Sequence, residues 1–174
     1  RMASAFAIAE RLARLTADGE IIVEPAKPQV DFGGVSVNPP PGAFLQATAA
    51  AETAMAELVM RHFSRARRIA ELFAGVGTFA LRLARKAEVH AVEADAAALA
   101  ALDRGFRFAT GLKKVSHEKR DLFRRPLTAK ELSAYDGVVF DPPRAGAEDQ
   151  SAQIARSDVP LPPTPPAPPP MSPP

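Results

Sequence analysis

Strand-like and helix-like segments alternate along the chain from residue 67 onward, and this pattern limits the fold more than any other feature. The strand-like segments are the short apolar runs RIAELFA, EVHAVEA, KVSHEKRDLF and DGVVFDPPR. The helix-like segments that follow them cover residues 78–87, 95–111, 128–135 and 146–156. Such alternation predicts right-handed βαβ crossovers, and therefore an α/β fold with a doubly wound parallel sheet.

The chain before residue 67 has a different pattern. Apolar residues at helical spacing predict a short helix over residues 2–15, and a turn at Asp18-Gly19 leads into a strand that ends at Val23. The pair Gly33-Gly34 indicates a hairpin or a bulge. A longer helix is predicted after Thr48, which is a favourable N-cap residue.

The last residues, 160–174, carry ten of the chain's 18 prolines and no charge. Proline cannot continue a helix or an interior strand, so we expect polyproline II or disorder there. A non-native or frameshifted end is favoured over a ligand for a proline-recognising domain. We therefore divide the chain into a remnant of a preceding domain (1–30), one α/β domain (31–159) and a proline-rich tail (160–174).

A two-glycine turn follows the first strand of the α/β domain, and an acid ends the second. Gly75 and Gly77 let the backbone pass close to a ligand, although such turns serve packing about as often. Glu93 stands 18 residues after Gly75, where it can accept hydrogen bonds from both ribose hydroxyls of a nucleoside or cap the next helix, as Asp95 can. The third glycine of a phosphate-binding turn is missing, which favours S-adenosylmethionine over NAD.

Two further acids follow the third and fourth strands. Asp121 can accept a hydrogen bond from an adenine amino group, or it is an exposed loop acid. Asp141 is followed directly by Pro142 and Pro143, which cannot donate hydrogen bonds to a neighbouring strand. The strand must stop there, and we expect the prolines to stiffen a loop that lines a substrate pocket.

The motifs GAFLQAT, ELFAGVGTFALRLA, HAVEAD, RDLF and VVFDPPRAGA occur in this order. Together they resemble the S-adenosylmethionine-dependent RNA (uracil-5-)-methyltransferases, over roughly residues 32–154. The resemblance implies a Rossmann-like class I methyltransferase fold with strand order 3-2-1-4 and further strands beyond. It also implies methyl transfer from S-adenosylmethionine to carbon 5 of uracil in ribosomal or transfer RNA.

The resemblance implies roles for individual residues. Amino-group methyltransferases usually carry an aromatic residue after the two prolines, so Arg144 favours uracil methylation. With Asp141, Pro142 and Pro143, it is expected in the substrate pocket. The cofactor-pocket positions that the motifs imply are Gln46, Phe73, Gly75, Gly77, Thr78, Glu93, Asp121 and Asp141.

The chain contains no cysteine. In the family it resembles, a cysteine thiolate adds to carbon 6 of uracil to make carbon 5 nucleophilic, and a base then removes the carbon-5 proton. Where the family has its Ser-Cys-Asn-Pro segment, this chain enters the proline-rich tail. We therefore expect a C-terminally truncated, inactive enzyme that keeps its cofactor pocket and has no catalytic residue.

The missing strands also have a structural consequence. In the family the fourth strand lies in the middle of the sheet, so here its outer edge is expected to be uncovered. Uncovered strand edges pair with other chains, and parallel sheets are normally buried on both faces. We expect the isolated chain to be marginally stable or to self-associate.

Charge and composition bear on the partners. The basic stretches at 61–68 and 113–125 can contact RNA phosphates or form solvated helix ends and loops, and the net charge of +2 is compatible with a polyanionic partner. The three histidines lack ligand spacing, so we expect no metal; no apolar run is long enough for a membrane span, and we expect a cytoplasmic location. Two alternatives remain, an amino-group methyltransferase with a DPP motif and a non-catalytic RNA- or protein-binding module on this scaffold.

Overall fold

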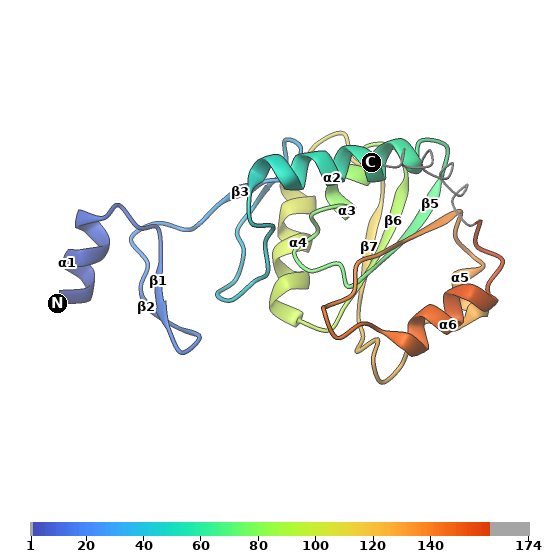
Figure 1. Cartoon of the computed structure of the whole chain (residues 1–174). Helices are drawn as coiled ribbons and strands as arrows, with labels where there is room; N and C mark the ends of the chain where they lie inside the picture. Colours follow the sequence, from blue (N-terminus) through green and yellow to red (C-terminus); the bar gives the residue numbers. More distant parts are fainter. Residues whose placement is uncertain (1, 161–174) are drawn as a thin grey trace, which may run out of the picture.

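A four-stranded parallel sheet forms the centre of the fold (Figure 1). The structure is a computed structural model that describes residues 2–160. The strands of the sheet are β5 (Arg68–Leu72), β6 (Glu88–Glu93), β7 (Val115–Lys119) and β8 (Gly137–Phe140). They lie in the order β7-β6-β5-β8, and each neighbouring pair is parallel. The predicted α/β fold class and the predicted 3-2-1-4 strand order are therefore confirmed.

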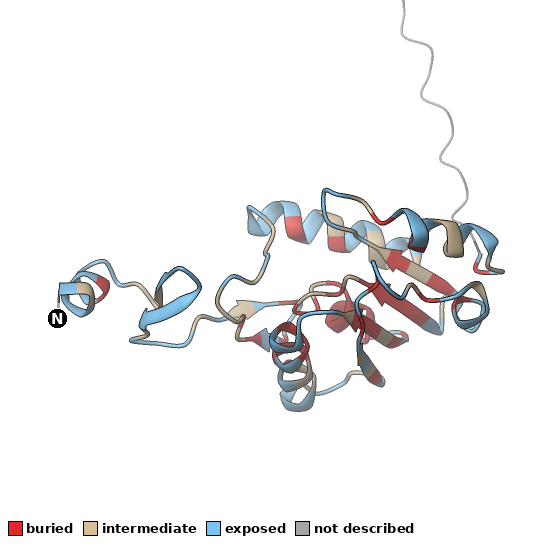
Figure 2. Ribbon diagram, turned by 90° about the horizontal axis from the view of Figure 1, so that it is seen from below, coloured by how far each residue is buried: buried red, intermediate tan, exposed pale blue. Residues whose placement is uncertain are grey.

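Helices cover both faces of this sheet. They are α2 (Ala49–His62), α3 (Ala80–Leu83), α4 (Ala96–Phe108), α5 (Ala129–Leu132) and α6 (Glu148–Arg156). A further helix, α1 (Met2–Ala9), does not cover the sheet. Side chains of β5 alternate between the two faces: Ile69 packs in a cluster with residues of α2, α3 and α4, whereas Ala70 and Leu72 pack with residues of α5 and α6. Burial on both faces explains why β5 is almost entirely buried, as Figure 2 shows for the sheet.

Two predicted helix caps are confirmed by hydrogen bonds. The hydroxyl of Thr48 accepts a hydrogen bond from the backbone N–H of Ala51 at 3.1 Å. The carboxylate of Asp95 accepts one from the backbone N–H of Ala97 at 2.7 Å. These side chains satisfy N–H groups that have no partner within the helix, and so they fix the starts of α2 and α4.

Two small hairpins precede the sheet. Their strands are β1 (Leu15–Ala17), β2 (Glu20–Val23), β3 (Val30–Asp31) and β4 (Ser36–Val37). Asp18 and Gly19 both have positive φ, as a tight two-residue hairpin turn requires, which confirms the predicted turn. Figures 1 and 2 show α1, β1 and β2 apart from the sheet and mostly exposed, while Arg14 ties this region to the rest through a 2.9 Å hydrogen bond to the carbonyl of Pro39.

Several predicted helices are shorter in the structure than expected, among them the one predicted over 128–135, and in two of them the backbone shows the reason. The helix predicted over residues 2–15 ends at Ala9, because Arg11 adopts positive φ and the N–H of Leu12 turns back to the carbonyl of Ala7. The helix predicted over 78–87 is α-helical only over Ala80–Leu83, because i→i+3 hydrogen bonds tighten the chain after it. In both places a turn within a helix-like apolar pattern ends the helix.

Buried polar contacts attach the helices to their neighbours. Arg82 of α3 donates to Glu52 of α2 at 2.6 Å and to the carbonyl of Thr78 at 2.9 Å. On the other face, Gln150 of α6 is fully buried, accepts from the N–H of Leu127 at 2.8 Å and donates to its carbonyl at 3.2 Å. A buried polar group without such a partner is costly, so these contacts fix how the helices dock.

Three further predictions concern the outer edge of β8, membrane spans and the proline-rich tail. Within residues 2–160, β8 pairs with β5 alone, so its other edge carries no strand. No helix in this part of the chain is long and apolar enough to cross a membrane. The predicted proline-rich tail lies outside the described residues from 161 onward.

Candidate functional site

The glycine turn after β5 has an unusual backbone. Phe73, Gly75 and Gly77 all have positive φ, at 62°, 54° and 91°. A Cβ on Gly77 would lie 2.9 Å from the side chain of Leu102, so this glycine is required for packing against α4. A Cβ on Gly75 would meet nothing within 4 Å. The two glycines therefore differ, because Gly77 is set by packing while Gly75 borders open space into which a ligand can approach.

Glu93, at the end of β6, lies directly against this turn. Its Oε2 accepts a hydrogen bond from the N–H of Gly75 at 2.9 Å, and its Oε1 accepts from the N–H groups of Ala94 at 2.8 Å and Asp95 at 3.0 Å. The structure thus brings together the glycine turn and the acid that the sequence spacing paired. A carboxylate has about four acceptor positions, so these three bonds leave capacity for a hydroxyl donor.

Asp121, after β7, is placed beside Glu93 by the backbone. The N–H of Arg120 donates to the carbonyl of Glu93 at 2.9 Å. The carboxylate of Asp121 accepts from the N–H of Phe123 at 3.0 Å and of Arg124 at 3.3 Å. Asp121 therefore already stabilises a turn, and its partly exposed carboxylate faces the same edge of the sheet as Glu93.

An aromatic cluster joins the ends of three strands. The ring of Phe73 lies 5.4 Å from that of Phe123 and 6.0 Å from that of Phe140, centroid to centroid, in tilted arrangements. These are ordinary distances for favourable aromatic pairs. Phe123 is half exposed, so the cluster presents an apolar surface at the carboxyl edge of the sheet.

The loop after β8 holds the remaining predicted substrate-pocket residues. Asp141, Pro143 and Arg144 are exposed and Pro142 is half-buried. The carbonyl of Pro143 accepts a hydrogen bond from the N–H of Gly146 at 2.8 Å, which closes a turn before α6. The loop is therefore ordered by its own backbone, and it directs its polar side chains outward.

Gln46 and Thr78 are less directly connected to this edge. Gln46 lies in the loop before α2, and its neighbour Leu45 packs against a cluster that contains Val76 of the glycine turn. Thr78 uses its backbone carbonyl to accept from Arg82. Among the described residues neither side chain makes a hydrogen bond.

Glu71 is a candidate that we did not predict from the sequence. It lies within β5, is 2% exposed, and its Oε2 has no hydrogen-bond partner among the described residues. Burial raises its pKa to about 8, with a smaller contribution from the carboxylates of Asp141 and Glu93, while hydrogen bonds from the N–H groups of Ala80 and Phe79 oppose the rise. The available signal was an acid inside an apolar strand, just before the glycine turn.

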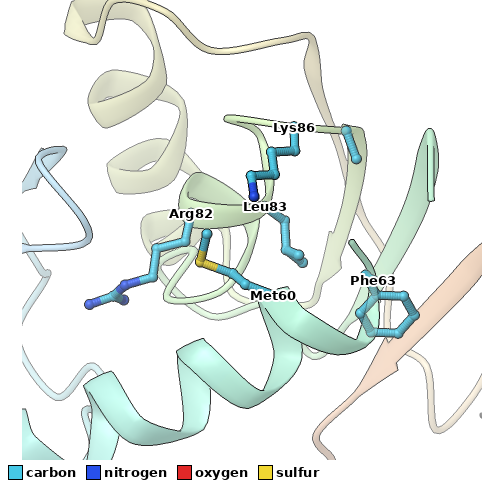
Figure 3. Close-up of a pocket in the computed structure, with 6 residues that line it drawn as sticks. Met60, Phe63, Arg82, Leu83 and Lys86 are labelled. Atoms are coloured by element: carbon cyan, nitrogen blue, oxygen red, sulfur yellow. The ribbon is translucent and has the colours of Figure 1, made fainter. Parts of the chain in front are cut away.

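A small hollow between α2 and α3 is separate from this edge (Figure 3). It is lined by Met60, Phe63, Arg82, Leu83, Lys86 and Ala87. Phe63 also packs against Gly137 at the start of β8, so the hollow lies toward the opposite end of the strands. Its volume of about 10 Å³ is at the lower limit for one water molecule, which excludes a nucleoside.

The predicted site residues therefore gather mainly at one edge. Glu93 ends β6, and the other four lie one to three residues after a strand: Phe73, Gly75, Asp121 and Asp141. The carboxyl ends of these parallel strands form the edge where ligands bind in open α/β sheets.

Known proteins resemble this chain in sequence and in fold, although no family model matches it. An uncharacterized RNA methyltransferase of Mesorhizobium japonicum is 71% identical over 161 residues, which are 92% of this chain and 39% of that protein. The 23S rRNA (uracil(1939)-C(5))-methyltransferase RlmD of Chromohalobacter salexigens is 38% identical over 125 residues, 68% of this chain and 25% of that protein. This chain thus spans well under half the length of these relatives.

A solved structure supports the fold assignment. The tRNA (uracil-54, C5)-methyltransferase of Pyrococcus abyssi, in complex with S-adenosyl-L-homocysteine, superposes with a TM-score of 0.67 at 21% identity. The match covers 83% of this chain and 36% of that structure. Its fold is the Rossmann-like arrangement described above. With the sequence relatives, these findings confirm the resemblance to RNA methyltransferases that the motifs indicated.

Proposed function

We propose that this chain is the cofactor-binding part of an S-adenosylmethionine-dependent RNA methyltransferase. The observation that carries the proposal is the 2.9 Å hydrogen bond from the N–H of Gly75 to Glu93, which places an acceptor carboxylate beside an open glycine turn. The unpartnered buried oxygen of Glu71 under the same turn fits a cationic ligand such as S-adenosylmethionine. A bound S-adenosylmethionine supplies an activated methyl group on a sulfonium.

The residues of the carboxyl edge then have distinct tasks. Glu93 accepts hydrogen bonds from the ribose hydroxyls, and Asp121 accepts one from the adenine amino group. Gly75 allows close approach of the backbone, while the ring of Phe73 contributes to the apolar wall of the pocket. The other residues assigned to the cofactor pocket are Gln46, Gly77, Thr78 and Asp141.

The proposed substrate is a uracil base of RNA, methylated at carbon 5. The order of the motifs and Arg144 after the two prolines support this choice, as does the similarity to RlmD. Asp141, Pro142, Pro143 and Arg144 would line the pocket for the flipped base. Because the chain has no cysteine to activate carbon 6, we propose that it binds cofactor but does not complete the reaction alone.

Titration calorimetry with S-adenosylmethionine tests the proposal. We expect the full chain to bind, and Glu93→Gln to weaken binding by about tenfold or more, because a hydrogen bond to a charged acceptor is lost. Glu57→Gln, which removes an exposed carboxylate on α2, is the matched control and should bind like the wild type. No heat at millimolar cofactor would refute the assignment and favour a non-catalytic module on this scaffold.

Two further expectations belong to the same proposal. Methylated RNA from the longer relatives should contain 5-methyluridine, and an N-methylated base would favour the amino-group alternative. We also propose a cytoplasmic location, where RNA substrates occur, and self-association through the unpaired edge of β8. Sedimentation that shows only monomer over a wide concentration range would contradict self-association.

A further inference from the structure

Loops from distant parts of the sequence meet at the amino edge of the sheet, opposite the candidate site. The N–H of Glu88 donates to the carbonyl of Arg67 at 2.8 Å, which joins the starts of β5 and β6. The N–H of Lys113 donates to the carbonyl of Ala84 at 2.7 Å, which joins the loops before β6 and β7. The segments that begin neighbouring strands are therefore side by side.

These segments bring together six cations, which we call the amino-edge surface. Its members are Arg65, Arg67, Arg68, Lys86, Lys113 and Lys114. All six are exposed, and within residues 2–160 none of them forms an ion pair. The sequence had suggested two separate basic stretches, and the fold joins the first of them to the start of the second.

Few acids offset this charge. Glu88 and Asp136 are the acids on the same strand-start segments. The carboxylate of Asp136 accepts hydrogen bonds from the backbone N–H groups of Arg67 at 2.8 Å and Arg68 at 2.9 Å. Asp136 therefore stabilises the backbone at the start of β5. These bonds, with the positive charge nearby, keep the pKa of Asp136 below its ordinary value. Six cations against two acids leave the surface with a net positive charge.

We propose that the amino-edge surface binds the phosphate backbone of RNA, at a segment distinct from the one held at the carboxyl edge. This inference rests on the proposed RNA methyltransferase function. β5 separates the two edges by its five residues, about 13 Å at the usual rise per strand residue. Because the sheet and the helices on its two faces lie between these edges, a base held at the carboxyl edge and phosphates held at the amino edge belong to different nucleotides of an RNA that reaches around the sheet.

The chemistry of the surface favours a nucleic acid over a membrane. Surfaces that bind anionic lipids combine cations with exposed apolar side chains that enter the bilayer. The loops that carry these six cations have no large exposed apolar residue, and one such residue, Phe108, stands at the end of α4 before the loop that carries Lys113 and Lys114. A single aromatic side chain is not the apolar face that such lipid-binding surfaces have. The cations lie instead in a row at the starts of β7, β6 and β5, an arrangement that suits a chain of phosphates.

The test compares two triple variants of the full chain. Arg65→Gln, Lys113→Gln and Lys114→Gln together neutralise three cations of the amino-edge surface. Lys27→Gln, Arg104→Gln and Lys130→Gln together remove the same charge from exposed positions outside it. The probe is a fluorescein-labelled RNA hairpin, and its affinity is measured by anisotropy over a range of salt concentrations.

We expect the amino-edge variant to bind the hairpin about tenfold more weakly at low salt. Its slope of log affinity against log salt should fall by about 2, since each lost phosphate contact reduces the slope by about 0.7–0.9. The control variant should keep the wild-type slope. Equal losses in the two variants would overturn the proposal, because net charge alone would then explain binding.

Two further measurements distinguish RNA binding from membrane binding and from cofactor binding. Wild-type chain that binds phosphatidylserine vesicles but not the hairpin would overturn the proposal in favour of a membrane surface. S-adenosylmethionine binding should be the same in the wild type and both triple variants. If cofactor binding persists while no RNA binding is seen, the RNA surface is refuted and the cofactor site stands.

Discussion

Replacing Glu71 by Gln tests how a buried acid is accommodated under the glycine turn. The side chain is 2% exposed, one carboxylate oxygen has no partner among the described residues, and the pKa is about 8. Glutamine has the same shape and can still accept hydrogen bonds from the N–H groups of Phe79 and Ala80. It removes only the ability to ionise, so the variant isolates the cost of burying a titratable group.

The sign and size of the effect follow from proton linkage. Below its ordinary pKa of 4.5, Glu71 is protonated in both folded and unfolded chains and contributes no pH dependence. Between pH 4.5 and about 8 the unfolded chain releases this proton while the folded chain keeps it, so the free energy of unfolding falls as pH rises. Each pH unit within this interval is worth about 1.4 kcal/mol, and the slope is smaller near its two ends, so the full interval costs roughly 4 kcal/mol.

Urea unfolding followed by circular dichroism, repeated across this pH interval, measures the effect. The variant should match the wild type near pH 4.5 and exceed its stability by roughly 4 kcal/mol near pH 8. Glu57→Gln, at an exposed site, should follow the wild-type curve. Parallel curves for wild type and Glu71→Gln would refute the reasoning, as would a carboxyl carbon signal of Glu71 that titrates near 4.5.

Three other changes test single contacts. Gly77→Ala should lower the free energy of unfolding by about 2 kcal/mol, because its φ is positive and its Cβ would lie 2.9 Å from Leu102. Gln150→Leu should cost roughly 2–4 kcal/mol, measured as a lower urea midpoint at constant slope, because both backbone groups of Leu127 lose their buried partner. The pKa of Glu131 is lowered to about 2 by hydrogen bonds from a neighbouring guanidinium, so its contribution to stability is present above pH 4.5 and lost as pH falls toward 2. Glu131→Gln should therefore flatten the acid limb of the stability curve.

The architecture was predictable because its signals are local and repeated. Strand and helix alternation predicted a parallel sheet, the family resemblance implied the order of its four strands, and Thr48 and Asp95 marked helix starts by the hydrogen bonds that they make. The same local signals failed at residues 10–15. There, apolar spacing continued a helical pattern, but Arg11 turned the chain and Leu15 began a strand. Pairing with β2, a contact across the hairpin, decided against the helix.

The site was predictable in its positions but less so in its contacts. Spacing placed Gly75 and Glu93 together, because parallel strands bring their carboxyl ends to one edge. It did not show that Glu93 and Asp121 would already be bonded to backbone N–H groups, since those donors depend on turns formed by the folded chain. Glu71 was overlooked for the same reason: the burial that raises its pKa arises from α3 and the sheet packing around it.

The acids at this edge differ in their hydrogen bonds and in their burial. Glu93 and Asp121 accept hydrogen bonds from backbone N–H groups, which fix the positions of their carboxylates. Glu71 is cut off from water, and this burial raises its pKa to about 8 although two backbone N–H groups donate to it. We propose that the fixed carboxylates hold the neutral nucleoside, and that the buried carboxyl of Glu71 favours a cationic ligand over a phosphorylated one.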